Sequence, residues 1–508
     1  MNTFKRKSLH AAVLAGLGAV GMAGTANAVH VNPDGLGSVL IYPYYTVRAD
    51  GGGASTAYYD NYISIVNTTA STKAVKVRFL EGKNSREVLD FNLYLSPNDV
   101  WTGAVTRDAS GNGLLRTWDN SCTAPEIPVV SGTQREVAFV NYGYDGANDD
   151  AAENDLGRTR EGYVEIIQMA DVVSGLLTTA AFDTWVASKH NAAGVPANCA
   201  GIRNAWTSGD YTAPANDGVA APTGGLGGSG TIINPLEGTD IGYPAVAMEN
   251  FRTVAQHNDP GNILPNLAQA TPQISDVFAG NRLVRTNWTA DILAGTVSPA
   301  APVSAIIMRD QVQNEYAAAA APVGLSTDWV ISFPTKAQHL AMSTLTISST
   351  LRQPFLNWFA STGSCETVVL TAYNREEATQ TSGLIFSPPP PAGVNRLCWE
   401  INVVRLNGPG GSPASNALGS LNLGQGLNLP YTEGWLRMQF SQATQQMVSA
   451  AGASTAYPLG GVVAALANPV TYFGLPVVGF MAQTFVNTTS LAAYGEAYPH
   501  RYTRRVTP

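Results

Sequence analysis

The residues with the clearest chemical potential are five carboxylates in one short acidic stretch. Asp145, Asp149, Asp150, Glu153 and Asp155 lie close together, with two asparagines between them. Calcium takes several oxygen ligands from one loop, so this stretch is the best candidate for a calcium site. Its spacing differs from that of an EF-hand loop, and the alternative is an acidic loop exposed to solvent. Calcium is the one cofactor that the sequence suggests.

A second set of acidic residues lies in the later part of the chain. Asp328, Glu376 and Glu400 would serve a polysaccharide-active enzyme if they converged in a cleft beside exposed aromatic rings. Glu376 follows Arg375 directly, so an ion pair of that arginine is the alternative there. Aromatic residues near the start of the chain either line a sugar-binding face or pack in the core, and they are Tyr42, Tyr44, Tyr45, Tyr58 and Tyr59.

The usual catalytic signatures are missing from the sequence. The segment 225–230 matches G-x-G-x-x-G, but the β-like Thr231-Ile232-Ile233 follows it where a dinucleotide site needs a helix, so we expect a glycine-rich loop. Neither G-x-S-x-G nor H-E-x-x-H occurs. The histidines after residue 28 are scattered, at His30, His190, His257, His339 and His500. We therefore predict no catalytic residue.

Four cysteines predict disulfide bonds. Cys122, Cys199, Cys365 and Cys398 allow three pairings, and spacing alone does not choose among them. We favour Cys122 with Cys199 and Cys365 with Cys398, because each pair stays within one expected domain. If the strands starting near residues 366 and 397 formed a simple hairpin, the second pair would lie at opposite ends of the ladder, so that pair requires another strand arrangement.

The N-terminal segment predicts export. Met1–Ala28 carries Lys5, Arg6 and Lys7, then a short apolar run, and ends in Ala26-Asn27-Ala28, the pattern of a cleavable signal peptide. No later stretch is long and apolar enough to predict a membrane span. The formal net charge of −8 argues against a nucleic-acid partner, because phosphate binding depends on clustered lysines and arginines.

The elements that must position these residues are β-strands. Only 13% of the residues are charged, whereas there are 50 glycines and 30 prolines, a composition that favours short strands and turns. In the range 74–80, Val75, Val77 and Phe79 alternate with Lys76 and Arg78, which predicts a strand with one solvent-exposed face. Similar runs cover 38–47, 62–67, 88–95 and 101–106, as in an antiparallel sandwich.

We expect a mainly β protein with two antiparallel β-sandwich (Ig-like) domains, long loops and a few short helices. The first domain covers 29–325, with loop and helix excursions over about 171–325 that include a short helix at 317–321. The second covers 326–508 and begins with a strand that carries Trp329, Ile331 and Phe333 on one face.

Several phrases together resemble a family of uncharacterised exported proteobacterial proteins, which are often labelled as hypothetical or cell-surface proteins. These phrases are Gly37–Tyr45, the strand pair of 77–95, Thr327–Lys336, Tyr373–Glu377 and Leu397–Glu400. The resemblance implies export and a shared β fold, and it brings no activity or catalytic residues.

The leading functional hypothesis is a secreted or cell-surface, non-catalytic protein with a structural, adhesive or assembly role. Its partners would be a second copy, joined through edge strands, or a cell-surface polymer. The alternative from another class is a secreted polysaccharide-active enzyme or a carbohydrate-binding protein. In either case the protein works outside the cytoplasm, in the periplasm or beyond it.

Overall fold

The computed structural model confirms the mainly β fold class. It describes residues 27–48, 58–340, 352–387, 393–420, 423–440, 443–458 and 462–508. The predicted signal peptide lies almost wholly outside the described residues, as does the proline run at 388–391. Within the described ranges, no helix is long and apolar enough to cross a membrane.

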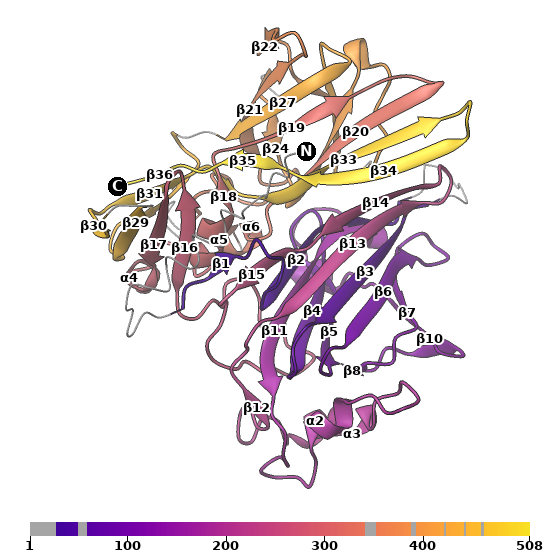
Figure 1. The fold of residues 1–508 in the computed structure, drawn as a ribbon, viewed down its shortest axis with the longest axis vertical. Helices are drawn as coiled ribbons and strands as arrows, with labels where there is room; N and C mark the ends of the chain where they lie inside the picture. Colours follow the sequence, from indigo (N-terminus) through magenta and orange to yellow (C-terminus); the bar gives the residue numbers. More distant parts are fainter. Residues whose placement is uncertain are drawn as a thin grey trace, which may run out of the picture.

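The first sandwich lies in the lower half of Figure 1 and consists of two large sheets. One sheet has the order β1 (His30–Val31), β15 (Val246–Glu249), β2 (Val39–Thr46), β11 (Glu161–Val172), β4 (Thr72–Glu81), β5 (Glu87–Leu95) and β8 (Cys122–Ala124), with β12 (Val219–Ala220) beside β11. The other has the order β14 (Thr239–Pro244), β13 (Leu226–Asn234), β3 (Asp60–Asn67), β6 (Val100–Arg107), β7 (Gly113–Thr117), β10 (Gln134–Ala138) and β9 (Val129–Ser131).

The prediction that β4 has one face in solvent is wrong. All its residues are buried, including Lys76 and Arg78. The Lys76 ammonium donates to the carbonyl oxygen of Pro260 at 2.9 Å, and Arg78 pairs with Glu165 on the neighbouring β11. A later loop that contains Pro260 therefore covers part of the polar face, and alternation along one strand does not predict such a cover.

The glycine-rich segment 225–230 is a strand, so the loop prediction is also wrong. Leu226–Asn234 forms β13, which pairs with β3 on one side and β14 on the other. A Cβ atom on Gly228 would lie 2.0 Å from the hydroxyl of Tyr42, and one on Gly230 would lie 2.4 Å from the ring of Tyr243. The glycines thus make room for two buried tyrosines.

The excursion over 171–325 is only partly loop and helix. It supplies four strands of the first sandwich, β12, β13, β14 and β15, and also the helices α2 (Thr184–Ser188) and α3 (Cys199–Ser208) at the lower end of Figure 1. Three short 3-10 helices precede it, η2 (Tyr142–Tyr144), η3 (Gly146–Asn148) and η4 (Leu156–Arg160). No helix forms at 317–321, because β19 (Gln311–Ala317) continues into extended backbone there.

A third, small β unit joins residues from both sides of the predicted domain boundary. Its largest sheet has the order β16 (Ile274–Ala279), β17 (Arg282–Asn287), β29 (Ser454–Pro458) and β30 (Ala464–Leu466). Beside it lie β28 (Gln446–Ser449), β31 (Val470–Phe473), β36 (Val506–Thr507), the pair β18 (Met308–Arg309) and β32 (Leu475–Pro476), and the helices α4 (Thr289–Leu293), α5 (Ala301–Ile307) and α6 (Lys336–Leu340). The predicted division into two domains thus covers the two large sandwiches and does not include this unit.

The second sandwich forms the upper part of Figure 1. One sheet has the order β22 (Thr379–Gln380), β21 (Glu366–Tyr373), β27 (Glu433–Phe440), β19 and β35 (Arg501–Thr503), with β24 (Arg396–Leu397) beside β21. The other has the order β23 (Phe386–Ser387), β26 (Gly424–Asn428), β25 (Ile401–Asn407), β20 (Val323–Ser332), β33 (Val478–Asn487) and β34 (Ala492–Pro499), and η6 (Pro409–Gly411) follows β25. The sandwich begins at β19, earlier than the predicted residue 326.

Both favoured disulfides are present. Cys122 at the start of β8 is bonded to Cys199 at the start of α3, and Cys365 is bonded to Cys398. Glu366 pairs with Leu397 in the β21–β24 ladder, which places the two flanking cysteines opposite each other. The strand that follows, β25, belongs to the other sheet. This is the different strand arrangement that the second pair required.

The two sandwiches are packed closely against each other. The rings of Tyr243 and Phe480 stack with centroids 4.7 Å apart, and the Ser332 hydroxyl donates to the carbonyl oxygen of Pro43 at 2.6 Å. Both contacts join strands of the first sandwich, β14 and β2, to strands of the second, β33 and β20. The sandwiches therefore share a buried interface.

Candidate functional site

The acidic stretch is a folded loop whose carboxylates form hydrogen bonds and ion pairs within the protein. Asp145 caps η3 by accepting from the backbone N–H of Gly146, and Asp155 accepts from that of Gly157. Asp149 accepts from the N–H of Ala151. These three carboxylates thus stabilise local turns of the loop.

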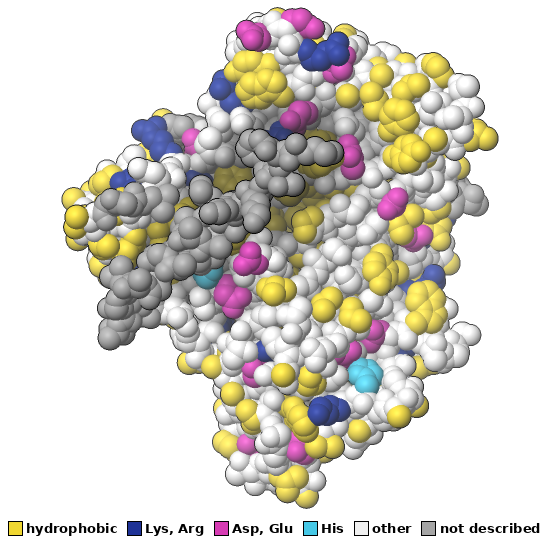
Figure 2. Space-filling view, viewed as in Figure 1, with side chains coloured by type: hydrophobic (Ala, Val, Ile, Leu, Met, Phe, Trp, Pro, Cys, Tyr) yellow, Lys and Arg dark blue, Asp and Glu magenta, His cyan; other side chains and the backbone are white. Residues whose placement is uncertain are grey.

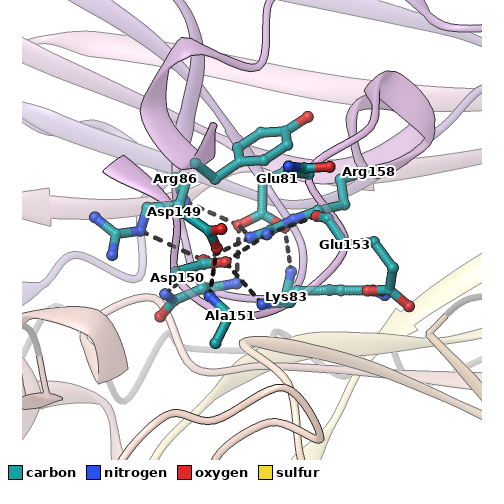
Figure 3. Close-up of polar contacts among 12 residues, drawn as sticks. Glu81, Lys83, Arg86, Asp149, Asp150, Ala151, Glu153 and Arg158 are labelled. Atoms are coloured by element: carbon teal, nitrogen blue, oxygen red, sulfur yellow. Dashed lines mark hydrogen bonds and ion pairs between the residues drawn. The ribbon is translucent and has the colours of Figure 1, made fainter. Parts of the chain in front are cut away.

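The other two carboxylates are paired with cations, as Figure 3 shows. Arg158 binds Asp150 at 2.7 Å and Glu81 at 2.9 Å, and the three side chains are almost completely buried. Although burial acts in the other direction, the hydrogen bonds from Arg158 and Asn84 hold the pKa of Asp150 below its usual value. The hydrogen bond from Lys83 lowers that of Glu153.

No metal-binding group emerges from this loop. Among the described residues, no group of three or more His, Cys, Asp or Glu side chains is arranged to hold a metal ion. The carboxylates of Asp150 and Glu153 point to Arg158 and Lys83 instead (Figure 3). A calcium ion at Asp145, Asp149 or Asp155 stays a prediction that metal titration would test.

The three acids of the enzyme alternative occupy three different environments. Asp328 is buried in the second sandwich, where it accepts from the Ser415 hydroxyl at 2.7 Å and the Leu418 N–H at 2.9 Å. Burial raises its pKa to about 6 despite these bonds. Glu376 lies in the exposed turn between β21 and β22, with 72% of its side chain exposed. None of the three acids lines the groove described below.

Glu400 belongs to a buried polar cluster between the sandwiches. Its backbone N–H donates to the carbonyl oxygen of Lys83, and burial raises the pKa of its carboxyl group to about 8, although the charge of Lys336 acts against this. The Lys336 ammonium donates at 2.6 Å to the carbonyl oxygen of Ser364. Burial lowers the pKa of Lys336 in turn. This cluster is enclosed and packs the two sandwiches together.

A serine and a histidine also meet, which the scattered sequence positions did not reveal. The Ser304 hydroxyl on α5 and Nε2 of His339 on α6 are 2.8 Å apart, and the same hydroxyl donates to Thr335 at 2.8 Å. Ser304 is 0% exposed and His339 is 2% exposed. A substrate has no access to this pair, so we interpret it as a contact between helices.

The most suitable place for a ligand is an open groove on the second sandwich, with a volume of about 570 Å³. It runs over β19 and β27 and reaches the edge of β33. Its lining includes Trp435, Tyr316, Gln313, Gln483 and two ion pairs. Figure 2 shows apolar and charged side chains next to each other at the top of the molecule, over the end of the sandwich that carries β21, β22 and β27.

One wall of this groove is aromatic, because Trp435 lines it and Tyr373 stacks against Trp435. Tyr373 and Trp435 are opposite each other on β21 and β27, and their rings stack with centroids 3.9 Å apart and planes 4° from parallel. The cross-strand partner of Trp435 on its other side is Glu315 on β19. Tyr373 thus supports the indole ring of Trp435, which lines the groove. A flat apolar wall of this kind suits a flat, partly apolar ligand.

Two exposed ion pairs flank the aromatic wall. Arg375 binds Glu433 at 2.9 Å, and Arg501 binds Glu315. All four side chains are between 45% and 66% exposed, so they remain accessible to a ligand. The hydrogen bond from Arg501 lowers the pKa of Glu315. The groove thus offers charged hydrogen-bonding groups whose charges cancel.

The aromatic residues that the sequence singled out for sugar binding do not line the groove, and one of them, Tyr58, is half-buried on the first sandwich with Arg107 over its ring at 3.9 Å. Tyr42, Tyr44, Tyr45 and Tyr59 are completely buried in the core of the first sandwich. The structure therefore supports the packing alternative for them. The groove is lined instead by Trp435, against which Tyr373 stacks, and the sequence pattern predicted a ligand-binding role for neither residue.

Comparison with known proteins adds no relative. No protein-family model matches the chain, and neither the curated proteins nor the solved structures contain a match. Any function must therefore be argued from the groove itself.

Proposed function

We propose that this chain is an exported, non-catalytic adhesive protein that binds a polysaccharide in the groove of its second sandwich. The observation that carries the proposal is Trp435, which lines an open groove and is held by stacking on Tyr373. A pyranose ring has an apolar face of C–H groups and a rim of hydroxyls. The indole ring would pack against the C–H groups, and the flanking ion pairs would form hydrogen bonds with the hydroxyls.

Two features support export. The sequence starts with a segment typical of a cleavable signal peptide. All four cysteines are bonded in pairs, and disulfides persist mainly in oxidising compartments outside the cytoplasm. A protein in that location meets cell-surface and extracellular polysaccharides directly.

The chemistry of the groove favours binding over hydrolysis. A glycoside hydrolase needs a carboxylic acid that stays protonated until it donates to the leaving oxygen. Glu315 is the reverse case, because Arg501 lowers its pKa. The carboxyl groups with strongly raised pKa values, Asp328 and Glu400, are buried away from the groove.

The test is a glycan-array screen with the secreted protein, followed by affinity measurements on the polysaccharide that binds best. We expect Trp435→Ala to weaken binding at least about tenfold, or about 1.4 kcal/mol. The matched control is Trp118→Ala, since Trp118 is a 54% exposed tryptophan on the first sandwich. This variant should bind like the unmodified protein, and neither should release reducing sugar.

Two results would contradict the proposal. One is a screen in which the unmodified protein binds no glycan. The other is a Trp435→Ala variant that binds as well as Trp118→Ala. Release of reducing sugar that Trp435→Ala abolishes would favour the enzyme alternative.

Self-assembly is a second candidate role, and one edge strand favours it. β9 forms the outer edge of the seven-stranded sheet, and its Val129 and Val130 are 52% and 51% exposed. An unprotected apolar edge is a site for strand addition by another chain. Sedimentation velocity over a range of concentrations tests this role, and a protein that stays monomeric throughout would exclude it.

A further inference from the structure

One face of β34 carries a row of exposed side chains that leads away from the groove. Tyr494, Glu496 and Tyr498 alternate with less exposed residues, as expected for one face of a strand. Tyr494 is 64% exposed and Tyr498 is 49% exposed. Figure 2 shows apolar side chains at the right of the upper sandwich, over the region of β33 and β34.

This row is continuous with the groove. Gln483, which lines the groove, is the cross-strand partner of Glu496, and Phe485 is the partner of Tyr494. The Tyr498 hydroxyl donates to Glu496 at 2.7 Å. The next residue, Pro499, accepts a hydrogen bond through its carbonyl oxygen from the Asn314 side chain at 3.4 Å, and Asn314 lines the groove, so this end of the row lies beside the groove.

The row is also longer than one sugar ring. Tyr494 and Tyr498 are four residues apart on one strand, which corresponds to roughly 13 Å. Trp435 lies beyond them, across Glu315 and Arg501. A monosaccharide bound at Trp435 would leave the tyrosines uncovered, whereas an extended chain would cover both.

The charges restrict the class of polymer. Arg375 and Arg501 are balanced by Glu433 and Glu315, and the row on β34 adds one acidic residue, Glu496. A polyanionic glycan would find no unpaired cation among the residues that line the groove. Hydroxyl groups, in contrast, accept from arginine and donate to glutamate without a change in net charge.

We infer that the groove and the row Tyr494–Glu496–Tyr498 form one extended binding surface for a neutral, linear polysaccharide that spans several sugar units. This inference rests on the proposed function and specifies its ligand. Trp435 holds one ring in the groove, and the tyrosines of β34 contact rings further along the same chain.

The experiment measures affinity against a length series of neutral gluco-, manno- and xylo-oligosaccharides, with polygalacturonate as the anionic polymer and chitosan as the cationic one. For the unmodified protein we expect affinity to rise with chain length and then level off. The double variant Tyr494→Ala/Tyr498→Ala should bind the longest oligomers about tenfold more weakly. It should bind the shortest oligomers like the unmodified protein.

The control is Tyr142→Ala, because Tyr142 is 79% exposed and lies on the first sandwich. It should leave the whole length series unchanged. Melting temperatures of all variants establish that they are folded.

The outcomes separate the inference from the proposed function. If Trp435→Ala loses binding and the double tyrosine variant keeps the full dependence on length, the extended surface is wrong and the groove stands. If polygalacturonate or chitosan binds through Trp435 and the neutral series does not, the neutral class is wrong. If Trp435→Ala binds like the unmodified protein, the proposed function itself fails.

Discussion

Charged side chains are used in opposite ways inside the first sandwich and beside the groove of the second. In the first, Lys73, Arg78 and Arg158 lie inside the fold, and each meets a carboxylate that is itself buried. Beside the groove of the second, the side chains of Arg375 and Arg501 are 66% and 64% exposed. The residue types are the same, so burial decides the role. Buried charges hold strands together, and exposed charges remain accessible to a ligand.

The energetic reason is the cost of removing charges from water. A buried ion with its partner deleted is left without compensation, and such a deletion typically costs about 3–5 kcal/mol. An exposed pair is screened by solvent and contributes about 0–1 kcal/mol. The comparison therefore predicts large stability effects for the buried pairs of the first sandwich and small effects for the exposed pairs beside the groove.

The largest effect is expected for Arg158→Ala. This change leaves Glu81 and Asp150 buried without their shared cation, so we expect the free energy of unfolding to fall by about 3–5 kcal/mol. Urea denaturation followed by circular dichroism measures it. The matched change beside the groove is Arg375→Ala, which should cost less than about 1 kcal/mol. Equal losses in the two variants would contradict the comparison.

The cluster between the sandwiches predicts a pH dependence. Burial raises the pKa of Glu400 to about 8, so the folded protein holds this proton where the unfolded chain has lost it. The contribution of Glu400 to stability is therefore complete at low pH and is lost as the pH rises from about 4.5 to about 8. Glu400→Gln removes this loss. Between pH 5 and pH 8, the free energy of unfolding of the variant should therefore rise by on the order of 2 kcal/mol relative to that of the unmodified protein.

Chemical denaturation at a series of pH values measures this gain. Glu376→Gln is the control, because Glu376 is exposed and should show no gain. A difference between Glu400→Gln and the unmodified protein that stays constant from pH 5 to pH 8 would show that Glu400 is ionised in the folded state. It would then belong with the compensated charges of the first sandwich.

The sequence predicted the kind of fold better than its connections. Composition and alternation identified a mainly β chain, and the expectation that each disulfide stays within one domain favoured the two pairs that are present. They failed where distant segments meet. Lys76 looked solvent-exposed because its cover, Pro260, lies far along the chain, and β17 pairs with β29 across the predicted boundary. Alternation within a segment predicts a strand, but it does not show which distant segment packs over that strand.

The site was harder to predict for the same reason. Tyr373 and Arg375 were noticed in the sequence, but Trp435, Glu433 and Glu315 join them only through cross-strand pairing. The strand that carries Trp435 offered one sequence signal. Its residues alternate, and Trp435 and Arg437 occupy the face opposite the core, where a large aromatic residue is unusual if that face contacts only water. The buried tyrosines near residue 42 were a more conspicuous aromatic cluster, and they belong to the core.

The smallest stability effect is expected for Glu315→Gln, which tests whether exposure or location determines a charge's role. The Glu315–Arg501 pair is more than half exposed, so its loss should change the free energy of unfolding by less than about 0.5 kcal/mol. Glycan binding should nevertheless weaken severalfold, because the variant loses a charged acceptor in the groove.

Glu126→Gln is the matched control, since Glu126 pairs with Arg135 and Arg203 on the surface of the first sandwich. If the exposure of an ion pair determines its effect on stability and its position determines its effect on binding, both variants stay stable. Only Glu315→Gln should then bind glycan more weakly. If both variants bind glycan equally well, the ion pairs of the groove contribute nothing to recognition, and the aromatic wall alone would carry it.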